Sequence, residues 1–279
     1  MLNSLHSIKL QQLANIEWLL TDVDDTLTWE GQLPDVTLKA LYDLQDVGIK
    51  VVAVTGACAG WCDQIAKVWP VHGAIGENGA FWMSQNESGF ETTSKVPLPQ
   101  MHALQGELKV ALANILEEYD GIEFATDQPF RFCDVAINLS QDREPVSEHL
   151  AKELLTRAKA LVIDGHNVNA SLSSIHLNVW IGEHSKRITS EAYVKAHSSC
   201  RNIDLDKLIY IGDSQNDEAM FAWLPTTFGV RNIQKVLPQL THKPSVLLDK
   251  DGGFGFAQLA RTIIEAKQSH IEEHLYRSA

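Results

Sequence analysis

The 279-residue sequence predicts an α/β protein whose core is discontinuous, with a second, α+β domain inserted into it. Short apolar runs rich in β-branched residues alternate with helix-like stretches up to about residue 82, and this rhythm resumes from residue 185. Between these points, several strand candidates surround single helices. Alternating strands and helices are typical of a parallel sheet with helices on both faces, whereas grouped strands indicate a partly antiparallel unit. We therefore expect a core formed by residues 1–82 and 185–279 and an inserted domain at 83–184.

The first part of the core is expected to alternate between buried strands and amphipathic helices. The run at 16–21 is short and apolar and ends at an acidic cluster, which suits a buried strand. Leucines recur at helical spacing within 34–47, and Gly48 stands where a helix commonly stops. The next expected elements are a β-branched strand at 49–54, a helix at 62–69 that Pro70 ends, and a strand at 72–75.

The same patterns predict the inserted domain and the return to the core. Residues 86–100 contain Gly89, Pro97 and Pro99 and are expected to form a loop. The insertion is then expected to contain helices at 104–116 and 148–161 and strands at 122–125, 132–139, 168–173 and 175–181. The returning core is expected to contain helices at 185–197, 216–223 and 256–267 and strands at 208–211, 227–230 and near 246.

The composition is that of an acidic globular protein. Lys and Arg number 23, Asp and Glu number 36, and the formal net charge is −13 at pH 7. Such a surface repels nucleic acid and anionic lipid, and the chain contains neither a basic run nor an apolar stretch of membrane-spanning length. No secretory signal is recognisable at its start. We therefore expect a cytoplasmic protein with no nucleic-acid or membrane partner, as a monomer or weak homodimer.

The cysteines predict reduced thiols rather than disulfides. They are few, form no CxxC pair and accompany no secretory signal. Two of them, Cys58 and Cys62, could share a helix face, but a zinc site would need two further ligands at suitable spacing, and the sequence offers none. The other two are Cys133 and Cys200.

Two acidic segments that follow apolar runs carry the functional signal. The first is DVDDT at 22–26, after the strand at 16–21, and the second is GDSQND at 212–217, after the strand at 208–211. Ligand sites of open α/β sheets lie at the carboxyl ends of strands, and Mg²⁺ prefers oxygen ligands such as carboxylates. Two carboxylate pairs at two strand ends therefore suit a magnesium site. Taken separately, each segment is more often an acidic surface loop.

Together with their strand context, these segments resemble the motifs of the haloacid dehalogenase superfamily of phosphohydrolases. Four motifs occur in the family's order and on the expected elements, and the resemblance covers essentially the whole core. It implies a Rossmann-like parallel-sheet core. The matching residues are Asp22, Asp24 and Thr26 of DxDxT, Val54-Thr55-Gly56 at a strand end, Lys186 ahead of a helix, and Gly212, Asp213, Asn216 and Asp217 of GDxxND.

The insertion between the second and third motifs resembles the branch of this family that carries a large α/β cap. That branch includes sucrose-phosphate phosphatase, mannosyl-3-phosphoglycerate phosphatase, phosphomannomutase and the Cof-type sugar-phosphate phosphatases. The segment ENGA at 77–80 is similar to the one that leads into the cap in that branch. Two residues depart from the pattern, since Asp25 and Arg187 stand where glycine is frequent. Asp25 adds negative charge near the metal site, and Arg187 could contact phosphate or substrate.

The resemblance assigns roles to the core residues. It implies that Asp22 is the nucleophile and that Asp24 protonates the leaving oxygen and then deprotonates water. It implies Mg²⁺ held by Asp22, the backbone carbonyl of Asp24 and Asp213, with Asp217 in support. It also implies that Thr55 donates a hydroxyl hydrogen bond to a phosphate oxygen and that Lys186 neutralises the phosphate charge, whereas a strand-end Thr cap and an exposed helix Lys are the ordinary alternatives for these two residues. The substrate contacts implied in the core are Thr55, Gly56, Glu77, Asn78, Lys186 and Asn216.

In the inserted domain, three polar residues lie in apolar surroundings. Arg131 could grip a second anionic group or pair with an acid such as Asp134, and His176 could bond sugar hydroxyls or belong to a hydrogen-bonded sheet face. For Asn178 the sheet-face interpretation is preferred. Three tryptophans near the core motifs could line a sugar site or belong to the core; they are Trp29, Trp61 and Trp82.

These observations predict a Mg²⁺-dependent phosphatase that hydrolyses a small phosphomonoester, such as a sugar or polyol phosphate, through an aspartyl phosphate. A phosphomutase of the phosphomannomutase type and a non-catalytic binding protein on the same fold are the alternatives. The presence of both Asp22 and Asp24 favours an active enzyme over a binding protein. The expected partner is a small-molecule phosphate ester.

Overall fold

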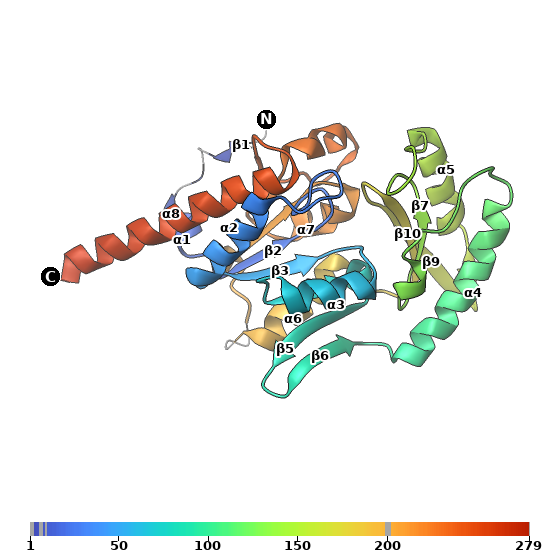
Figure 1. Cartoon of the computed structure of the whole chain (residues 1–279), viewed down its shortest axis with the longest axis horizontal. Coiled ribbons are helices and arrows are strands. Elements are labelled where there is room, and N and C mark those ends of the chain that lie inside the picture. Colours follow the sequence, from blue (N-terminus) through green and yellow to red (C-terminus); the bar gives the residue numbers. More distant parts are fainter. Residues whose placement is uncertain (1–2, 6–7, 9, 199–201, 279) are drawn as a thin grey trace.

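Two β-sheets organise the chain, of which a computed structural model describes residues 3–5, 8, 10–198 and 202–278. The larger sheet has nine strands in the order β1-β13-β12-β11-β2-β3-β4-β5-β6, and it is parallel except for β5 and β6 (Figure 1). Its strands are β1 (Asn3–Ser4), β2 (Trp18–Thr21), β3 (Lys50–Val54), β4 (Gly73–Gly76), β5 (Phe81–Asn86), β6 (Gly89–Ser94), β11 (Leu208–Gly212), β12 (Thr227–Gly229) and β13 (Val246–Leu247).

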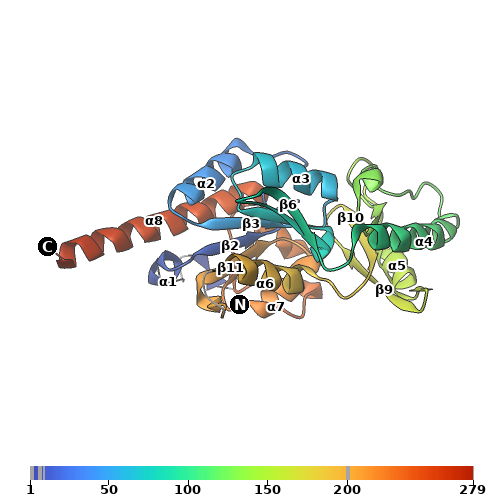
Figure 2. The ribbon, with the colours of Figure 1, turned by 90° about the horizontal axis from the view of Figure 1, so that it is seen from below.

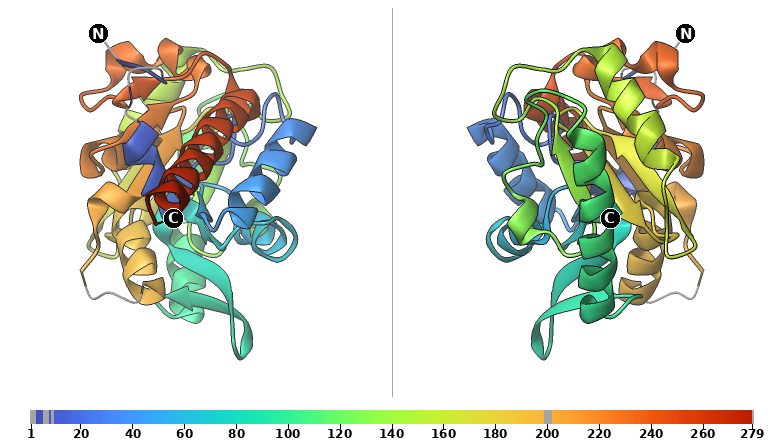
Figure 3. Two further views of the ribbon diagram at one scale, coloured as in Figure 1. Left: turned by 90° about the vertical axis from the view of Figure 1, so that its left-hand side faces the viewer. Right: turned by 90° about the vertical axis from the view of Figure 1, so that its right-hand side faces the viewer.

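The central strands are continuously apolar because helices cover both faces of the sheet. In β2, Leu19 packs into the apolar cluster on one face, whereas its neighbour Leu20 packs into the cluster on the other face. The left view of Figure 3 shows the two helical layers. The layer on the Leu19 side holds α1 (Leu10–Ala14), α2 (Asp35–Asp46), α3 (Ala59–Val68) and α8 (Gly252–Ser278), and the other holds α6 (Lys186–His197) and α7 (Glu218–Trp223).

The smaller sheet belongs to a separate unit, residues 98–181, which we call the cap. It is antiparallel, with strand order β7-β10-β9-β8, and it lies at the end of the molecule opposite the C-terminus (Figures 1 and 2). Both cap helices pack on one face of this sheet, against residues such as Leu177 and Val179. The cap elements are α4 (Leu98–Leu116), β7 (Val135–Asn138), α5 (Glu148–Lys159), β8 (Val162–Ile163), β9 (His166–Leu172) and β10 (His176–Ile181).

The expected fold class, a Rossmann-like parallel-sheet core with an inserted α+β domain, is confirmed, but the first boundary differs. Residues 83–94, expected in the inserted domain and partly as loop, form the β5–β6 hairpin and extend the core sheet. The prediction failed because β6, with the sequence GFETTS, is a polar edge strand that has no buried residue and no apolar alternation. The expected loop also ends early, because α4 begins at Leu98 and accommodates Pro99 in its first turn.

Other elements differ in extent. The strand expected at 122–125 is reduced to a single bridge between Phe124 and Ile137. Helix α8, expected at 256–267, continues to Ser278 and projects beyond the core (Figure 2). The short elements β1 and α1 were not expected, and Cys200 lies outside the described residues. Among the described helices, none combines the length and apolar character that a bilayer span requires.

Candidate active site

Three polar residues stand directly after neighbouring strands of the large sheet, at the edge that faces the cap (Figure 1). Asp22 follows β2, Thr55 follows β3 and Asp213 follows β11. The three strands are adjacent in the order β11-β2-β3 and run parallel, so their carboxyl ends meet at one edge. The topology thus brings together residues from both ends of the chain.

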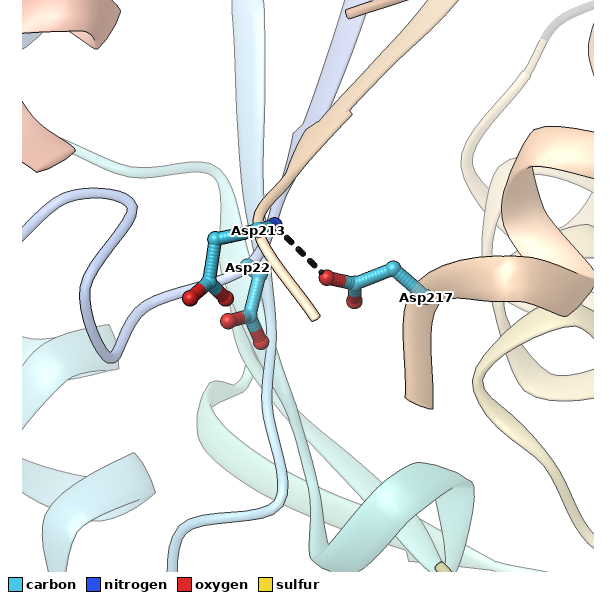
Figure 4. A group of neighbouring side chains, drawn as sticks. All are labelled: Asp22, Asp213 and Asp217. Atoms are coloured by element: carbon cyan, nitrogen blue, oxygen red, sulfur yellow. Dashed lines mark hydrogen bonds between the residues drawn. The ribbon is translucent and has the colours of Figure 1, made fainter. Parts of the chain in front are cut away.

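Three buried carboxylates converge at this edge (Figure 4). Asp22, Asp213 and Asp217 each offer a ligand atom, and these atoms lie within 4.8 Å of one another. Their exposed fractions are 4%, 6% and 0%. Oxygen ligands at this spacing suit a hard divalent cation such as Mg²⁺. Asp24, expected to contribute its backbone carbonyl, does not join the side-chain group.

Lys186 places the single ammonium of this cluster against two of the carboxylates. It is the first residue of α6, whose N-cap Ser185 accepts a hydrogen bond from Ile188. The Lys186 Nζ donates to Asp22 Oδ1 at 2.6 Å, to Asp217 Oδ1 at 2.8 Å and to Asn216 Oδ1 at 3.1 Å. All three of its hydrogens are therefore used, and the ordinary alternative of an exposed helix Lys is wrong, since Lys186 is 2% exposed.

The two carboxylates of the GDSQND segment differ in how many of their hydrogen-bond acceptor positions the protein fills. Asp217 accepts hydrogen bonds from Lys186 Nζ, the Tyr210 hydroxyl and the backbone N–H groups of Asp213 and Ser214. Its four lone-pair positions are thus occupied. In contrast, Asp213 Oδ1 is buried and has no hydrogen-bond partner among the described residues. A cation would satisfy this oxygen, so the donor set fits Mg²⁺ with Asp213 as a ligand and Asp217 in support.

Asn232 is a site residue that the sequence analysis missed. Its Nδ2 donates to Asp213 Oδ2 at 3.2 Å and to the Asp25 carbonyl at 3.0 Å. Its Oδ1 accepts from the backbone N–H of Gly252 at 2.9 Å. One amide therefore ties together the loops after β2 and β11 and the start of α8. The available signal was an amide side chain just after the buried strand expected at 227–230.

Burial and crowding of like charges raise the pKa values of Asp22 and Asp24. Burial raises the pKa of Asp22, which Lys186 partly offsets and Asp217 reinforces. Burial and the neighbouring Asp25 raise the pKa of Asp24 to about 6. A carboxyl that titrates near neutrality can both give and take a proton, as acid–base catalysis requires.

The Thr55-Gly56 segment has a hydroxyl group that can donate a hydrogen bond and a glycine against which two asparagine side chains pack closely. The Thr55 Oγ1 accepts a hydrogen bond from the backbone N–H of Ala57 at 2.9 Å, which leaves its proton free to donate. A side chain at Gly56 would meet amide atoms of Asn78 and Asn178 at 3.1 Å, so the glycine permits their close approach. Both amide atoms of Asn78 are buried without a hydrogen-bond partner among the described residues.

The two residues that replace glycines behave differently. Asp25 has a φ of 54°, in the left-handed region that glycine favours and aspartate tolerates better than most residues. The glycine preference at this position thus reflects the backbone. Arg187 is exposed and pairs with Glu191 at 3.2 Å along α6, and its contact with phosphate or substrate stays a prediction.

Glu77, expected to contact substrate, is instead fully buried and engaged by the protein. Its Oε1 accepts from the backbone N–H groups of Ala59 and Phe132, and its Oε2 accepts from those of Cys133 and Asp134. Four hydrogen bonds leave the carboxylate no free position for a ligand. The substrate role is therefore wrong, and Glu77 joins core to cap.

Arg131 is paired with acidic side chains, which was the alternative to a substrate contact. Its side chain has no exposed surface and forms ion pairs with Asp127 and Asp134, both at 2.9 Å. Asn178 donates to Asp134 Oδ2 at 2.9 Å and to the Gly56 carbonyl at 3.3 Å. These bonds agree with the preferred interpretation, in which Asn178 belongs to a hydrogen-bonded sheet face. The expected grip of Arg131 on a substrate anion is thus wrong.

A cavity of about 1010 Å³ lies between the strand ends and the cap. His176 lines it and bonds Gln141 Oε1 through Nε2 at 2.7 Å. Trp29 and Trp61 also line it, whereas Trp82 packs edge-to-face on Tyr193 in the core. Other residues of the cavity wall are Asp24, Asp25, Trp69, Asp127, Ser140, Ser174, Asp213 and Asn232.

Comparisons with known proteins identify the family of this chain. The sequence model of the haloacid dehalogenase-like hydrolase family matches residues 19–252. A phosphoglycolate phosphatase of Methanobrevibacter smithii is 21% identical over 226 residues, which are 80% of this chain and 89% of that protein. Among solved structures, Thermoplasma acidophilum protein 0175 has a TM-score of 0.64 at 14% identity, covering 89% of this chain and 98% of that one.

A sucrose-phosphatase from a Synechocystis species, solved with sucrose and phosphate, has a TM-score of 0.60 at 14% identity, covering 88% of this chain and 97% of that one. The family expected from the motifs is confirmed. This chain belongs to the haloacid dehalogenase-like hydrolases and is an enzyme of the phosphatase type.

Proposed function

We propose that this protein is a Mg²⁺-dependent phosphatase that hydrolyses a small sugar or polyol phosphate through an aspartyl-phosphate intermediate. One observation carries the proposal. The Asp22 carboxylate lies 2.6 Å from the Lys186 ammonium, beside the unpaired oxygen of Asp213, and the chain then runs on to Asp24 at the wall of the cavity. A nucleophile, one ammonium group and an acid–base residue that lines the cavity thus lie together at the strand ends.

The residues suggest a two-step displacement. In the first step, an Asp22 oxygen forms a bond to phosphorus while the bond from phosphorus to the ester oxygen breaks, and Asp24 gives its proton to that oxygen. In the second step, Asp24 takes a proton from water as the water oxygen attacks phosphorus, and the bond to Asp22 breaks. Inorganic phosphate leaves, and both carboxyls return to their starting states.

Charge neutralisation accompanies both steps. Lys186 offsets the charge of the phosphoryl oxygens, and the free proton of the Thr55 hydroxyl can be donated to one of them. Asp22 and Asp213 would hold Mg²⁺, which when bound supplies a further positive charge at the phosphoryl group. Asp217 positions Asp213 by accepting a hydrogen bond from its backbone N–H group.

The cavity supports a hydroxyl-bearing leaving group. Its wall combines tryptophan faces with uncharged polar groups such as those of Ser140, Gln141 and Ser174. Sugar rings are commonly bound by such combinations of an aromatic face and directional hydrogen bonds. The similarity in fold to a phosphatase solved with sucrose and phosphate agrees with this substrate class.

The test is phosphate release from a panel of phosphomonoesters, with and without Mg²⁺, by the wild type and by Asp22→Asn. We expect Mg²⁺-dependent release by the wild type and at least a ~10³-fold loss in the variant, which retains the shape of Asp22 but not its anionic nucleophile. Asp164→Asn, on an exposed turn of the cap, is the matched control. Retention of a tenth of the activity in Asp22→Asn, or an isomeric phosphate in place of free phosphate, would contradict the proposal.

A further inference from the structure

We infer that the cavity accepts phosphomonoesters whose leaving group is uncharged near the ester oxygen and rejects those with a second anion there, and that Asp127 sets this preference. The inference rests on the proposed function and specifies its substrate class. Three features of the cap carry it, namely the saturation of Arg131, the position of Asp127 and the charges of the cavity wall.

Arg131 has no hydrogen-bond donor left for a substrate. The Nε donates to Asp127 Oδ1, and Nη2 donates to Asp127 Oδ2 and faces His176 Nδ1 at 3.4 Å. The Nη1 donates to the Asp134 carboxylate and to the Gly56 carbonyl. A guanidinium has five N–H groups, and six acceptor atoms from four residues surround this one. One guanidinium also faces two carboxylates, so it cannot offset a third anion brought by substrate.

Of the Asp127–Arg131 ion pair, only the acid reaches the cavity. Asp127 lines the cavity together with Asp24, and its side chain is 10% exposed. The Arg131 side chain has no exposed surface and does not reach the cavity wall. A leaving group bound next to Asp24 therefore meets a carboxylate from the cap, in a partly desolvated space where like charges repel strongly.

The remaining charged groups on the cavity wall do not cancel this repulsion of an anionic leaving group. His176 contributes none at neutral pH, because burial and Arg131 lower its pKa to about 4. Lys152 is exposed and pairs with Glu148 at 2.5 Å. Lys235 lines the cavity but is exposed, so solvent screens its charge. The acidic residues on the wall are Asp24, which carries the proton in the proposed first step, and Asp25, Glu30, Asp127, Glu148 and Asp213.

Uncharged groups on the cap wall offer hydrogen bonds to hydroxyl groups instead. His176 Nδ1 faces an Arg131 donor, so the neutral ring carries its proton on Nε2 and donates it to Gln141 Oε1. The amide N–H groups of Gln141 remain available. The Ser174 hydroxyl is buried without a hydrogen-bond partner among the described residues. A neutral polyol can satisfy these groups without electrostatic cost.

The test compares two esters of similar size, 2-phosphoglycolate and 2-hydroxyethyl phosphate. The first carries a carboxylate where the second carries a neutral hydroxymethyl group. We expect the wild type, with Mg²⁺, to show at least a ten-fold higher kcat/KM for 2-hydroxyethyl phosphate, which corresponds to about 1.4 kcal/mol. Phosphoglycolate is the substrate in the name of the archaeal relative, so equal or better turnover of 2-phosphoglycolate would overturn the inference. Hydrolysis of neither ester nor any other phosphate would instead sink the proposed function.

Asp127→Asn tests the residue assigned to the preference. The variant keeps the shape of Asp127 and should narrow the ratio of the two kcat/KM values by at least five-fold. Asp164→Asn, which removes the same charge from an exposed cap turn, should leave the ratio unchanged. An unchanged ratio in a folded Asp127→Asn protein would overturn the assignment. If that variant does not fold, the comparison of the two esters in the wild type still decides the substrate preference.

Discussion

The Glu77 carboxylate, in the core, accepts a 2.7 Å hydrogen bond from the backbone N–H of Cys133, in the cap. The N–H groups on either side, of Phe132 and Asp134, donate to the same carboxylate at 2.8 and 3.1 Å. A fourth donor, the N–H of Ala59 at 3.1 Å, comes from the start of α3. One buried charge therefore fixes the cap segment before β7 to the core, close to the catalytic strand ends.

Glu77→Gln should destabilise the protein, because the amide NH₂ would face N–H donors and leave some of them unsatisfied. Each buried unsatisfied polar group costs about 1–3 kcal/mol, so we expect the free energy of unfolding to fall by about 2–4 kcal/mol. Urea titration followed by circular dichroism measures this change. Glu107→Gln, on the exposed surface of α4, is the matched control and should change it by less than about 0.5 kcal/mol. Equal effects of the two variants would contradict the anchoring role.

Arg131→Met should be strongly destabilising, because it leaves Asp127 and Asp134 buried without their cation. Removal of one partner from a buried ion pair costs about 3–5 kcal/mol. Arg157→Met is the control, since Arg157 pairs with Glu118 at the cap surface, where ion pairs contribute only about 0–1 kcal/mol. Thermal melting of both variants checks the difference. A melting temperature of Arg131→Met within a degree of wild type would show that the buried triad is not structural.

The positions of the candidate site residues at the strand ends were predictable from sequence, because each residue directly follows a strand along the chain. Asp22 and Asp213 each follow an apolar strand directly, and parallel strands deliver such residues to one edge. The role of Glu77 was not predictable, because three of its four partners are backbone N–H groups more than fifty residues away, and no side-chain pattern in the sequence indicates such partners. Arg131 has neighbouring acids in sequence, but only the fold shows that it is buried and fully bonded.

Mg²⁺ should raise the melting temperature, because it binds the converged carboxylates of the folded state only. Binding at a hundred times the dissociation constant stabilises the folded state by about 2.7 kcal/mol. Asp213→Asn should lose most of this increase, since Asp213 carries the buried unpaired oxygen. Differential scanning fluorimetry with Mg²⁺ or EDTA measures the shift, and Asp164→Asn should retain it. Identical melting of the wild type in Mg²⁺ and EDTA would contradict the metal site.

His176 should make the stability of the wild type depend on pH below about 6.5. Burial and Arg131 lower the pKa of His176 from 6.5 to about 4 in the folded state. Between these values the unfolded chain binds a proton that the folded chain does not, so this contribution is complete above pH 6.5 and is lost as pH falls toward 4. From pH 7.5 to pH 5 the expected loss is about 2 kcal/mol.

Comparison with His176→Gln isolates the contribution of His176 to the pH dependence of the free energy of unfolding. The comparison is needed because carboxyls with raised pKa values bind protons in the folded state and shift the stability in the opposite direction. Those carboxyls are present in both proteins and cancel in the difference. The charges that act on His176 are Arg131, which lowers its pKa, and Asp127 and Asp142, which raise it. Urea titrations of both proteins at pH 7.5 and pH 5 give the difference directly. The wild type should lose about 2 kcal/mol relative to the variant, and a relative gain would mean that His176 is charged in the folded protein.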